Sequence, residues 1–600
     1  MKGAEEIRRM IIETSFANGG HLASSLGAVE LAMALAEVFE PTKDRIVWDV
    51  GHQAYAWKIL TGRDGDFTSL RRMDGIAPFP LPRESAADAA VSGHAGCALS
   101  VAAGLAAARD SRGSDEHVVA VVGDAALANG LSFEALNNCH AATRKLILVL
   151  NDNRMSISRP VGALSALLGR LLTNVRYNRM KAATERVGHR LGLTFFRETY
   201  HKIESRIKGL FLGSRFFEQF GFRYIGPVDG HDLGALRAAL TVAKEDKRSV
   251  VVHVYTTKGK GYPPAEQDPT KYHGVGPSQS EPSVRTWSDA FGAALVEKAK
   301  ADSRIVALTA GMKDGTGLTA FAREWPNRFY DVGIAEEHMV AFAAGLAAGG
   351  LRPVVAVYST FLQRAVDQVM HDVCIANLPV VFCVDRAGAV GADGVTHQGL
   401  YDIALLRTLP NLTICQPKDE EDLKALLNEA FLRNGPTVIR YPRGAVPKEV
   451  EIRGGQRDEL LHSPPPPLFS TSCSIWATGD QLEKAQAVAA KVPGAEVTFA
   501  RYLKPFDVEL LKRQRAEGRR IVSIENGAVA GGFGEAIGAD LRFGWPDAFI
   551  PHGSVPELEA RYHFDVESIV SAIQTPQTPQ TPQTSQTSQT SQTSQTSQTS

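Results

Sequence analysis

Asp124 and Asn153 are the two side chains whose types and setting most clearly suggest chemistry. Each follows an apolar, β-branched run, and Gly123 directly precedes Asp124. Mg²⁺ bound to a diphosphate takes one or two protein oxygen ligands, which an Asp and an Asn at neighbouring strand ends would supply. A glycine-led turn lets backbone N–H groups approach phosphate oxygens. The pair predicts a magnesium–diphosphate site, whereas either residue alone would be interpreted as an ordinary loop cap.

A second group of ionisable residues follows later in the chain. Glu336 stands just before the apolar run MVAFAAGLAAGG, where a carboxylate ordinarily compensates a helix dipole. Other polar residues lie in or beside predicted strand ends: Tyr358, Arg364, Arg386, Asp393, His397 and Arg443. Charged groups next to apolar strands cost free energy unless they are paired or functional. The arginines suit a phosphate or a carboxylate, which a guanidinium binds bidentately.

These residues share one kind of position, the carboxyl end of a predicted buried strand. Five such loops carry polar or glycine residues: 51–53, 123–125, 151–153, 359–360 and 385–386. Open α/β sheets bind ligands at this edge. The recurrence indicates two sheets that face one shared site.

Three bodies supply these strands. Residues 1–282, 283–463 and 464–573 each alternate short β-branched runs with helical patterns, which predicts an α/β fold with mainly parallel sheets. The polar stretch PSQSEP at 277–282 and the prolines at 464–467 mark the boundaries. Residues 574–600 consist of Gln-Thr-Pro and Gln-Thr-Ser triplets, which have no apolar side chains to bury and are expected to be disordered.

The composition excludes several classes of protein. The 65 basic and 66 acidic residues nearly cancel, so we expect no general attraction to nucleic acid or to an anionic membrane. The six cysteines form no CxxC or metal-finger spacing, which favours reduced, buried thiols. No window holds the roughly twenty apolar residues that span a bilayer. We therefore expect a cytoplasmic protein.

Several long motifs resemble the 1-deoxy-D-xylulose-5-phosphate synthases, a family of transketolase-like thiamine diphosphate enzymes. They are GGHLASSLGAVEL, IVWDVGHQAY, LNDNRMSIS, IGPVDGHD, YSTFLQRAVDQ, DRAGAVGADGVTHQG and RYPRG. The resemblance implies the transketolase-like thiamine diphosphate-binding fold and a homodimer. It also implies the reaction of pyruvate with D-glyceraldehyde 3-phosphate, which releases CO₂ and forms 1-deoxy-D-xylulose 5-phosphate, a precursor of isoprenoids, thiamine and pyridoxal.

The resemblance further implies roles for individual residues. Magnesium would be held by Asp124, Asn153 and the backbone carbonyl of Met155. The cofactor would contact His52, Gly93, His94, Ala95, Ala125, Ala126, Asn153, Lys258, Tyr262 and Glu336, the last at its aminopyrimidine ring. Proton transfer would involve Glu336, His52, His397, His21 and His273. For each of the four histidines, a purely structural role is the alternative. Substrates would be bound by Arg71, Tyr358, Arg386, Asp393, His397 and Arg443.

The sequence also departs from the family pattern. Ala125 stands where a glycine is usual, Ala95-Gly96-Cys97 replaces a serine-rich run, Trp57 replaces a common histidine, and Glu337 replaces a glutamine. If position 125 required a positive φ, its methyl group would weaken cofactor binding by about 1 kcal/mol. Two alternatives stay open. The arginine pattern that suits a phosphate also fits a transketolase-type ketol transferase, and the changes at positions 95–97 and 125 fit a non-catalytic binding protein that keeps the fold.

Overall fold

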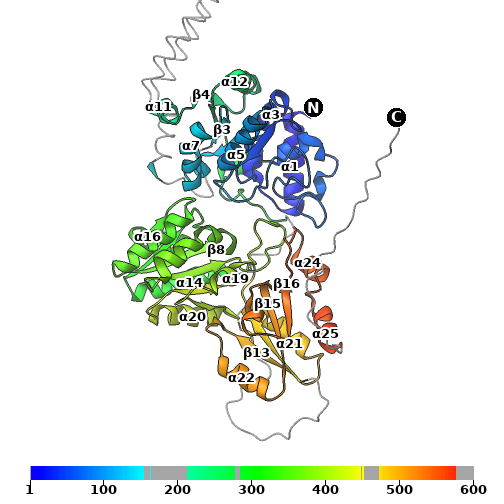
Figure 1. Ribbon diagram of the computed structural model, residues 1–600, viewed down its shortest axis with the longest axis vertical. Coiled ribbons are helices and arrows are strands. Elements are labelled where there is room, and N and C mark those ends of the chain that lie inside the picture. Colours follow the sequence, from blue (N-terminus) through cyan, green and yellow to red (C-terminus); the bar gives the residue numbers. More distant parts are fainter. Residues whose placement is uncertain are drawn as a thin grey trace, which may run out of the picture.

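The computed structural model describes residues 2–153, 162–163, 212–277, 284–447, 449–451 and 472–575. These residues form three α/β bodies that follow one another along the molecule (Figure 1). The predicted α/β class with mainly parallel sheets is confirmed. Four sequence predictions fall outside the described residues: the metal ligand Met155, most of the polar stretch at 277–282, the prolines at 464–467, and the tail from residue 576.

The first body contains a parallel five-stranded sheet in the order β1-β2-β3-β5-β4. Its strands are β1 (Arg45–Trp48), β2 (Val118–Gly123), β3 (Ile147–Asp152), β4 (Arg223–Asp229) and β5 (Val250–Tyr255). One face packs on α1 (Ala4–Asn18), α3 (Val29–Val38) and α12 (Leu233–Glu245). The other face packs on α5 (Ala98–Arg112), α7 (Gly130–Ala142) and α11 (Leu212–Gln219). Short helices lie between them: α2 (Leu22–Gly27), α4 (Tyr55–Lys58), α6 (Asp124–Leu127) and α13 (Pro263–Gln267).

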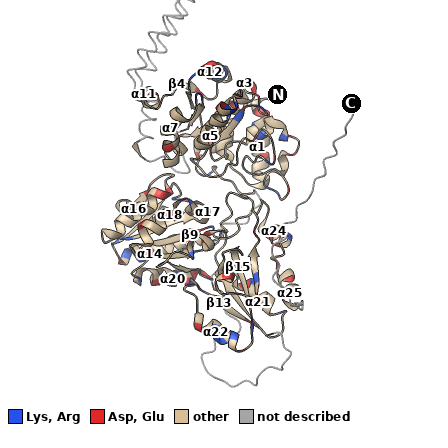
Figure 2. Ribbon diagram, viewed as in Figure 1, with Lys and Arg blue, Asp and Glu red and all other residues tan. Residues whose placement is uncertain are grey.

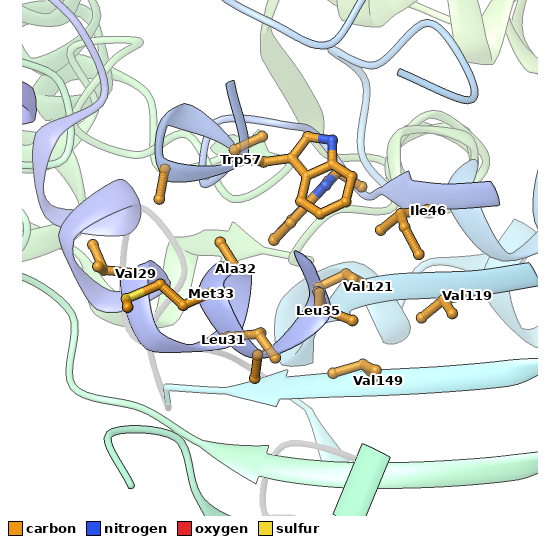
Figure 3. Packing of buried hydrophobic residues seen from close by; sticks show 14 of the residues in the cluster. Val29, Leu31, Ala32, Met33, Leu35, Ile46, Trp57, Val119, Val121 and Val149 are labelled. Atoms are coloured by element: carbon orange, nitrogen blue, oxygen red, sulfur yellow. The ribbon is translucent and has the colours of Figure 1, made fainter. Parts of the chain in front are cut away.

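Alternation along β2 explains how this sheet is covered on both faces. Val119 and Val121 enter the core beneath α3, whereas Ala120 and Val122 enter the core beneath α5 and α7. Figure 3 shows Val119 and Val121 on the same side of the sheet as Leu35 of α3. Trp57 lies in the same core, fully buried, and its indole N–H donates to the carbonyl of Ala87 at 3.2 Å. Its polar atom is therefore satisfied.

The second body contains a seven-stranded sheet in the order β14-β10-β11-β9-β8-β6-β7. Its strands are β6 (Ile305–Thr309), β7 (Phe329–Asp331), β8 (Arg352–Tyr358), β9 (Val381–Asp385), β10 (Thr413–Cys415), β11 (Thr437–Arg440) and β14 (Tyr502–Lys504). Its helices are α14 (Trp287–Ala301), α15 (Thr319–Glu324), α16 (Glu336–Ala348), α17 (Ser359–Leu362), α18 (Val366–Gln368), α19 (Asp402–Leu406) and α20 (Glu420–Leu432). Helices α14 and α20 cover one face, and α16 covers the other.

The third body contains a parallel four-stranded sheet in the order β13-β12-β15-β16. Its strands are β12 (Cys473–Thr478), β13 (Ala495–Ala500), β15 (Arg520–Ala528) and β16 (Leu541–Trp545). Its helices are α21 (Leu482–Ala489), α22 (Val508–Ala516), α23 (Phe533–Ala536), α24 (Val555–Arg561) and α25 (Val566–Gln574). Strand β14 leaves this body and pairs antiparallel with β10, so one strand after β13 completes the second sheet.

The cysteines and the helices bear on two expectations from composition, buried reduced thiols and no membrane span. All six cysteines are free thiols, five of them buried. No described helix has the length and apolar character needed to cross a membrane. Basic and acidic residues occur in all three bodies (Figure 2).

Leu148 on the central strand β3 offers a test of the first core. It is fully buried, and its substitution by Ala removes methyl groups from a close-packed site. We expect Leu148→Ala to lower the free energy of unfolding by about 2–5 kcal/mol, measured by chemical denaturation. Val242→Ala on α12, where the side chain is exposed, is the control and should change stability little. Equal effects of the two variants would contradict the described packing.

Candidate active site

A cavity of about 440 Å³ lies between the first and second bodies, at the carboxyl ends of their parallel strands. The residues after β1, β2 and β3 reach it from one side, and those after β8 and β9 reach it from the other. The predicted site residues that line it are His21, His52, Gly93, Ala95, Asp124, Ala125, Ala126, Asn153, Lys258, His273, Glu336, Tyr358, Arg386, Asp393 and His397. Segments far apart in the sequence therefore converge on one pocket.

Asp124 gives the first-body wall its electrostatic character. It begins α6 directly after β2, and it is almost fully buried. Burial and the neighbouring Asp152 raise the pKa of Asp124 to about 7. Burial also lowers the pKa of Lys258 to about 8, although Asp124 opposes that change. Burial and Asp152 disfavour the charged form of Asp124, and a cation bound beside it would stabilise that form.

These donors fit the magnesium–diphosphate group that the sequence suggested. Asn153 follows β3, the strand next to β2, and lines the same pocket as Asp124. Among the described residues no three His, Cys, Asp or Glu side chains cluster as a metal cage. A diphosphate-bound magnesium ion does not need such a cage, because phosphate and water oxygens complete its octahedron.

The backbone at Ala125 does not show the strain considered in the sequence analysis. Ala125 lies inside α6, and its φ is not positive. A methyl group at this position therefore causes no left-handed strain. At Gly123, an added Cβ would meet no atom within 4 Å, so space is open beside this residue of the first-body wall.

Three histidines form a compact cluster in the pocket. The ring centroids of His21, His52 and His273 lie 5.5–5.9 Å apart. Burial lowers the pKa of His21 to about 4, and burial lowers the pKa of His52 and His273 far below the ordinary value. All three are uncharged at neutral pH. The Nδ1 atoms of His21 and His52 are buried without a hydrogen-bond partner among the described residues, which suits a polar ligand.

Glu336 comes from the second body, at the first position of α16. Burial raises its pKa despite the nearby Arg364 guanidinium. Arg364 donates to the Glu336 carboxylate at 3.2 Å and to the carbonyl of Ala95 at 2.5 Å. One guanidinium thus joins the second-body carboxylate to a first-body loop. Glu337 is only half-buried, and its charge raises the pKa of Glu336 less than burial does.

Asp49 is a pocket residue that the sequence analysis missed. Its carboxylate accepts hydrogen bonds from the backbone N–H groups of Gly96, at 2.9 and 3.0 Å, and of Ala98, at 3.2 Å. Burial raises the pKa of Asp49 to about 6. The position directly after β1, within the motif IVWDVGHQAY, was the signal that could have identified it.

The opposite end of the pocket is rich in arginine. Asp393 forms ion pairs with Arg71 at 2.7 Å and with Arg443 at 2.8 Å. Burial works against the charged form of Asp393, but the two arginines outweigh it and hold the pKa below its ordinary value. The guanidinium of Arg386 lies over the Tyr358 ring, 4.1 Å from its centroid.

His397 belongs to the same end of the pocket. Its ring stacks on Phe79, another pocket residue that the sequence analysis did not identify, with centroids 4.8 Å apart and planes 3° from parallel. Burial lowers the pKa of His397 to about 3.

Among the described residues, four predicted site residues do not line the cavity: Arg71, His94, Tyr262 and Arg443. Arg71 and Arg443 reach it indirectly, through their ion pairs with Asp393. His94 interacts through Nε2 with the Thr360 hydroxyl and the carbonyl of Thr396, at 2.9 and 2.8 Å. Tyr262 packs edge-on against Phe16 and Tyr272. The cofactor contacts predicted for His94 and Tyr262 remain predictions.

Comparison with known proteins agrees with this architecture. A family model described as 1-deoxy-D-xylulose-5-phosphate synthase matches residues 1–256. The transketolase pyrimidine-binding domain matches residues 283–449, and the transketolase C-terminal domain matches residues 470–569. These matches, with the α/β fold, place the chain among the transketolase-like enzymes, a family that implies dependence on thiamine diphosphate.

Curated relatives narrow the assignment. The chain is 44% identical to 1-deoxy-D-xylulose-5-phosphate synthase 1 of Geobacter metallireducens, over 95% of both chains. It is 43% identical to the synthase of Pelotomaculum thermopropionicum, over 95% of this chain and 93% of that protein. Synthase 2 of Geobacter sulfurreducens is 44% identical over 95% of both. The chain belongs to the 1-deoxy-D-xylulose-5-phosphate synthase family.

The pKa of Asp49 predicts a change of stability with pH. Between its ordinary value of 3.8 and about 6, the folded protein keeps a proton that the unfolded chain has lost. The stability of the wild type therefore falls as pH rises through this window, and Asp49→Asn removes that loss.

We expect the stability of Asp49→Asn relative to the wild type to rise by about 3 kcal/mol between pH 3.5 and 6.5. Chemical denaturation of both proteins at each pH measures the difference, and titrations elsewhere cancel. A difference that stays constant across this range would show that Asp49 ionises normally.

Proposed function

We propose that this protein condenses pyruvate with D-glyceraldehyde 3-phosphate, with release of CO₂, to form 1-deoxy-D-xylulose 5-phosphate. Thiamine diphosphate and Mg²⁺ are its cofactors. The observation that carries the proposal is the cavity in which Asp124 and Asn153 of the first body face Glu336 of the second. The names of the curated relatives support the same reaction.

The first-body wall would hold the diphosphate. Asp124 and Asn153 bind the magnesium ion, and Lys258, the wall's buried cation, offsets phosphate charge. Glu336 hydrogen-bonds the aminopyrimidine ring, and Arg364 keeps its carboxylate in place. When bound, thiamine diphosphate supplies the stabilisation of the carbanion that forms as pyruvate loses CO₂.

The uncharged histidines would handle protons within the pocket. His21, His52 and His273 are neutral at pH 7, so each ring has one nitrogen that accepts a proton and one that donates. His397 lies at the arginine-rich end of the pocket, near Asp393. Such groups can move a proton to or from a reacting oxygen without a charged ground state in a buried site.

The arginine-rich end would bind both substrates. Arg71, which lies behind Asp393 and is paired with it, would attract the carboxylate of pyruvate, and Asp393 would orient it. Tyr358, Arg386 and Arg443 bind the phosphate of the aldehyde, because guanidinium groups match phosphate oxygens in pairs. The homodimer implied by the family resemblance is part of the same proposal.

The first experiment is carbon-13 NMR of the purified protein with labelled pyruvate, glyceraldehyde 3-phosphate, thiamine diphosphate and Mg²⁺. We expect signals of 1-deoxy-D-xylulose 5-phosphate, and a loss of rate of about 10²–10⁴-fold in Glu336→Gln, which keeps the shape but removes the carboxylate. CO₂ release without this sugar would overturn the proposed acceptor.

The two alternatives give different results in the same experiment. A transketolase-type enzyme would transfer a two-carbon unit between sugars and would release no CO₂ from pyruvate. A non-catalytic binding protein would fold but would form neither CO₂ nor 1-deoxy-D-xylulose 5-phosphate, even at saturating cofactor.

Asp124→Asn tests the magnesium site without any turnover. In the wild type, thiamine diphosphate with Mg²⁺ should raise Tm, because a ligand that binds only the native state stabilises it. We expect Asp124→Asn to lose most of this increase, and EDTA to abolish it in the wild type. Asp115→Asn, at an exposed ion pair with Lys43, is the control and should keep the full increase. An undiminished increase in Asp124→Asn would remove Asp124 from the metal site.

A further inference from the structure

A short segment of the third body touches both loops that carry the Arg71–Asp393 ion pair. Residues 551–553, here called the wedge segment, lie between β16 and α24 (Figure 1). One loop, residues 71–76, belongs to the first body. The other, residues 386–399, belongs to the second body and carries Asp393 and His397.

The wedge segment is hydrogen-bonded to the second-body loop through Gln398. The Gln398 side chain donates to the carbonyl of Pro551 at 3.0 Å. Its own carbonyl accepts from the backbone N–H groups of Val390, at 2.7 Å, and Gly391, at 3.3 Å. Because Gln398 is buried, these bonds are made away from water, where each broken bond is costly.

His552 connects the wedge segment to the first-body loop. Its Nε2 atom lies 3.0 Å from the carbonyl oxygen of Gly75, so the ring nitrogen donates and the carbonyl accepts. The loop is closed by the N–H of Arg71, which donates to the carbonyl of Ile76 at 2.8 Å. Arg71 and Asp74 both have left-handed backbones, with φ of 69° and 58°. Non-glycine residues keep such φ values only where neighbouring structure holds them.

A second third-body residue holds the start of the 386–399 loop. The Asn526 side chain accepts the backbone N–H of Ala389 at 3.0 Å. Its amide group donates to Asp480 at 2.7 Å, within the third body. The third body therefore fixes this loop at two separate points.

The two loops meet at the ion pair between Arg71 and Asp393, whose atoms lie 2.7 Å apart. Because the partners come from different bodies, their geometry depends on how the loops are placed relative to each other. We infer that His552 is a positioning residue, which acts from the third body to hold the Arg71 loop against the Asp393 loop and so shapes the substrate end of the pocket. The kinetic part of this inference rests on the proposed function.

Hydrogen exchange and kinetics of three variants test the inference. We expect His552→Ala to increase deuterium uptake in peptides that cover residues 69–77 and 386–399, with no increase in β2 or β3. The value of kcat/KM for pyruvate should fall about 10- to 100-fold, because displaced positioning groups weaken orientation. Thiamine diphosphate affinity should stay unchanged. His552→Gln keeps a donor toward Gly75 and should restore much of both properties.

Arg561→Ala is the matched control. Arg561 also reaches the first-body loop, through an ion pair with Asp74 at 2.6 Å, but both side chains are exposed. Exposed pairs contribute little, so this variant should behave as the wild type. If His552→Ala does not fold, His552→Leu, which fills the space without a donor, replaces it in the comparison with His552→Gln.

The inference would be overturned if a folded His552→Ala or His552→Leu variant took up deuterium in both loops at the wild-type level. It would also be overturned if Arg561→Ala increased the uptake as much as His552→Ala. The exchange measurement needs no turnover. A wild type that makes no 1-deoxy-D-xylulose 5-phosphate would therefore defeat the proposed function and leave this inference to be decided by exchange alone.

Discussion

Arg364 makes the contact on which the pocket most depends. Its guanidinium donates to the Glu336 carboxylate in the second body and to the carbonyl of Ala95 in the first. Each parallel sheet presents polar loops at its carboxyl edge, but neither edge alone encloses a cavity. The bridge fixes one edge opposite the other, and a planar group with several donors suits this task better than a lysine. Arg364 also approaches the sulfur of Cys97 at 3.6 Å, which adds a contact to the same loop.

Burial then divides the cavity into two electrostatic regions. In the region formed by β1, β2 and α16, burial raises the pKa of Asp49, Asp124 and Glu336. Near Asp393 the two arginines reverse this effect and keep the carboxylate charged. The first region therefore favours a cation or a hydrogen-bonding ring, whereas the second presents paired charges to anionic substrates. The uncharged histidines His21, His52 and His273 line the same cavity and add no charge to either region.

Much of this arrangement could be predicted from the sequence because it depends on local patterns. The β-branched runs of the three bodies, from RIVWDV (β1) to RIVSIEN (β15), became strands. The predicted polar loops after β1, β2, β3 and β9 line the pocket, whereas Ser359 and Thr360 after β8 do not. Strand β4 was missed because RYIGPVD contains Gly and Pro, which are typical of turns. Strand β14 was missed because three residues before a proline give no periodic signal. The contact between Arg364 and Ala95 joins residues 269 positions apart, and it depends on how two bodies dock, which no local pattern shows.

The motif DRAGAVGADGVTHQG also makes contacts between bodies that could not be predicted from local sequence. Its residues suggested a family, but its glycines also have a structural reason that only the three-dimensional arrangement gives. At Gly388, with φ of 90°, an added Cβ would lie 2.2 Å from the Asn526 side chain. At Gly394, with φ of 74°, it would lie 3.1 Å from the Cβ of His552. Both positions require a left-handed backbone and a close approach of the third body. The motif therefore carries the pocket residues Asp393 and His397 and also contacts the third body. Substitutions at Gly388 or Gly394 would disturb the pocket because they would prevent the close packing of the third body against this loop.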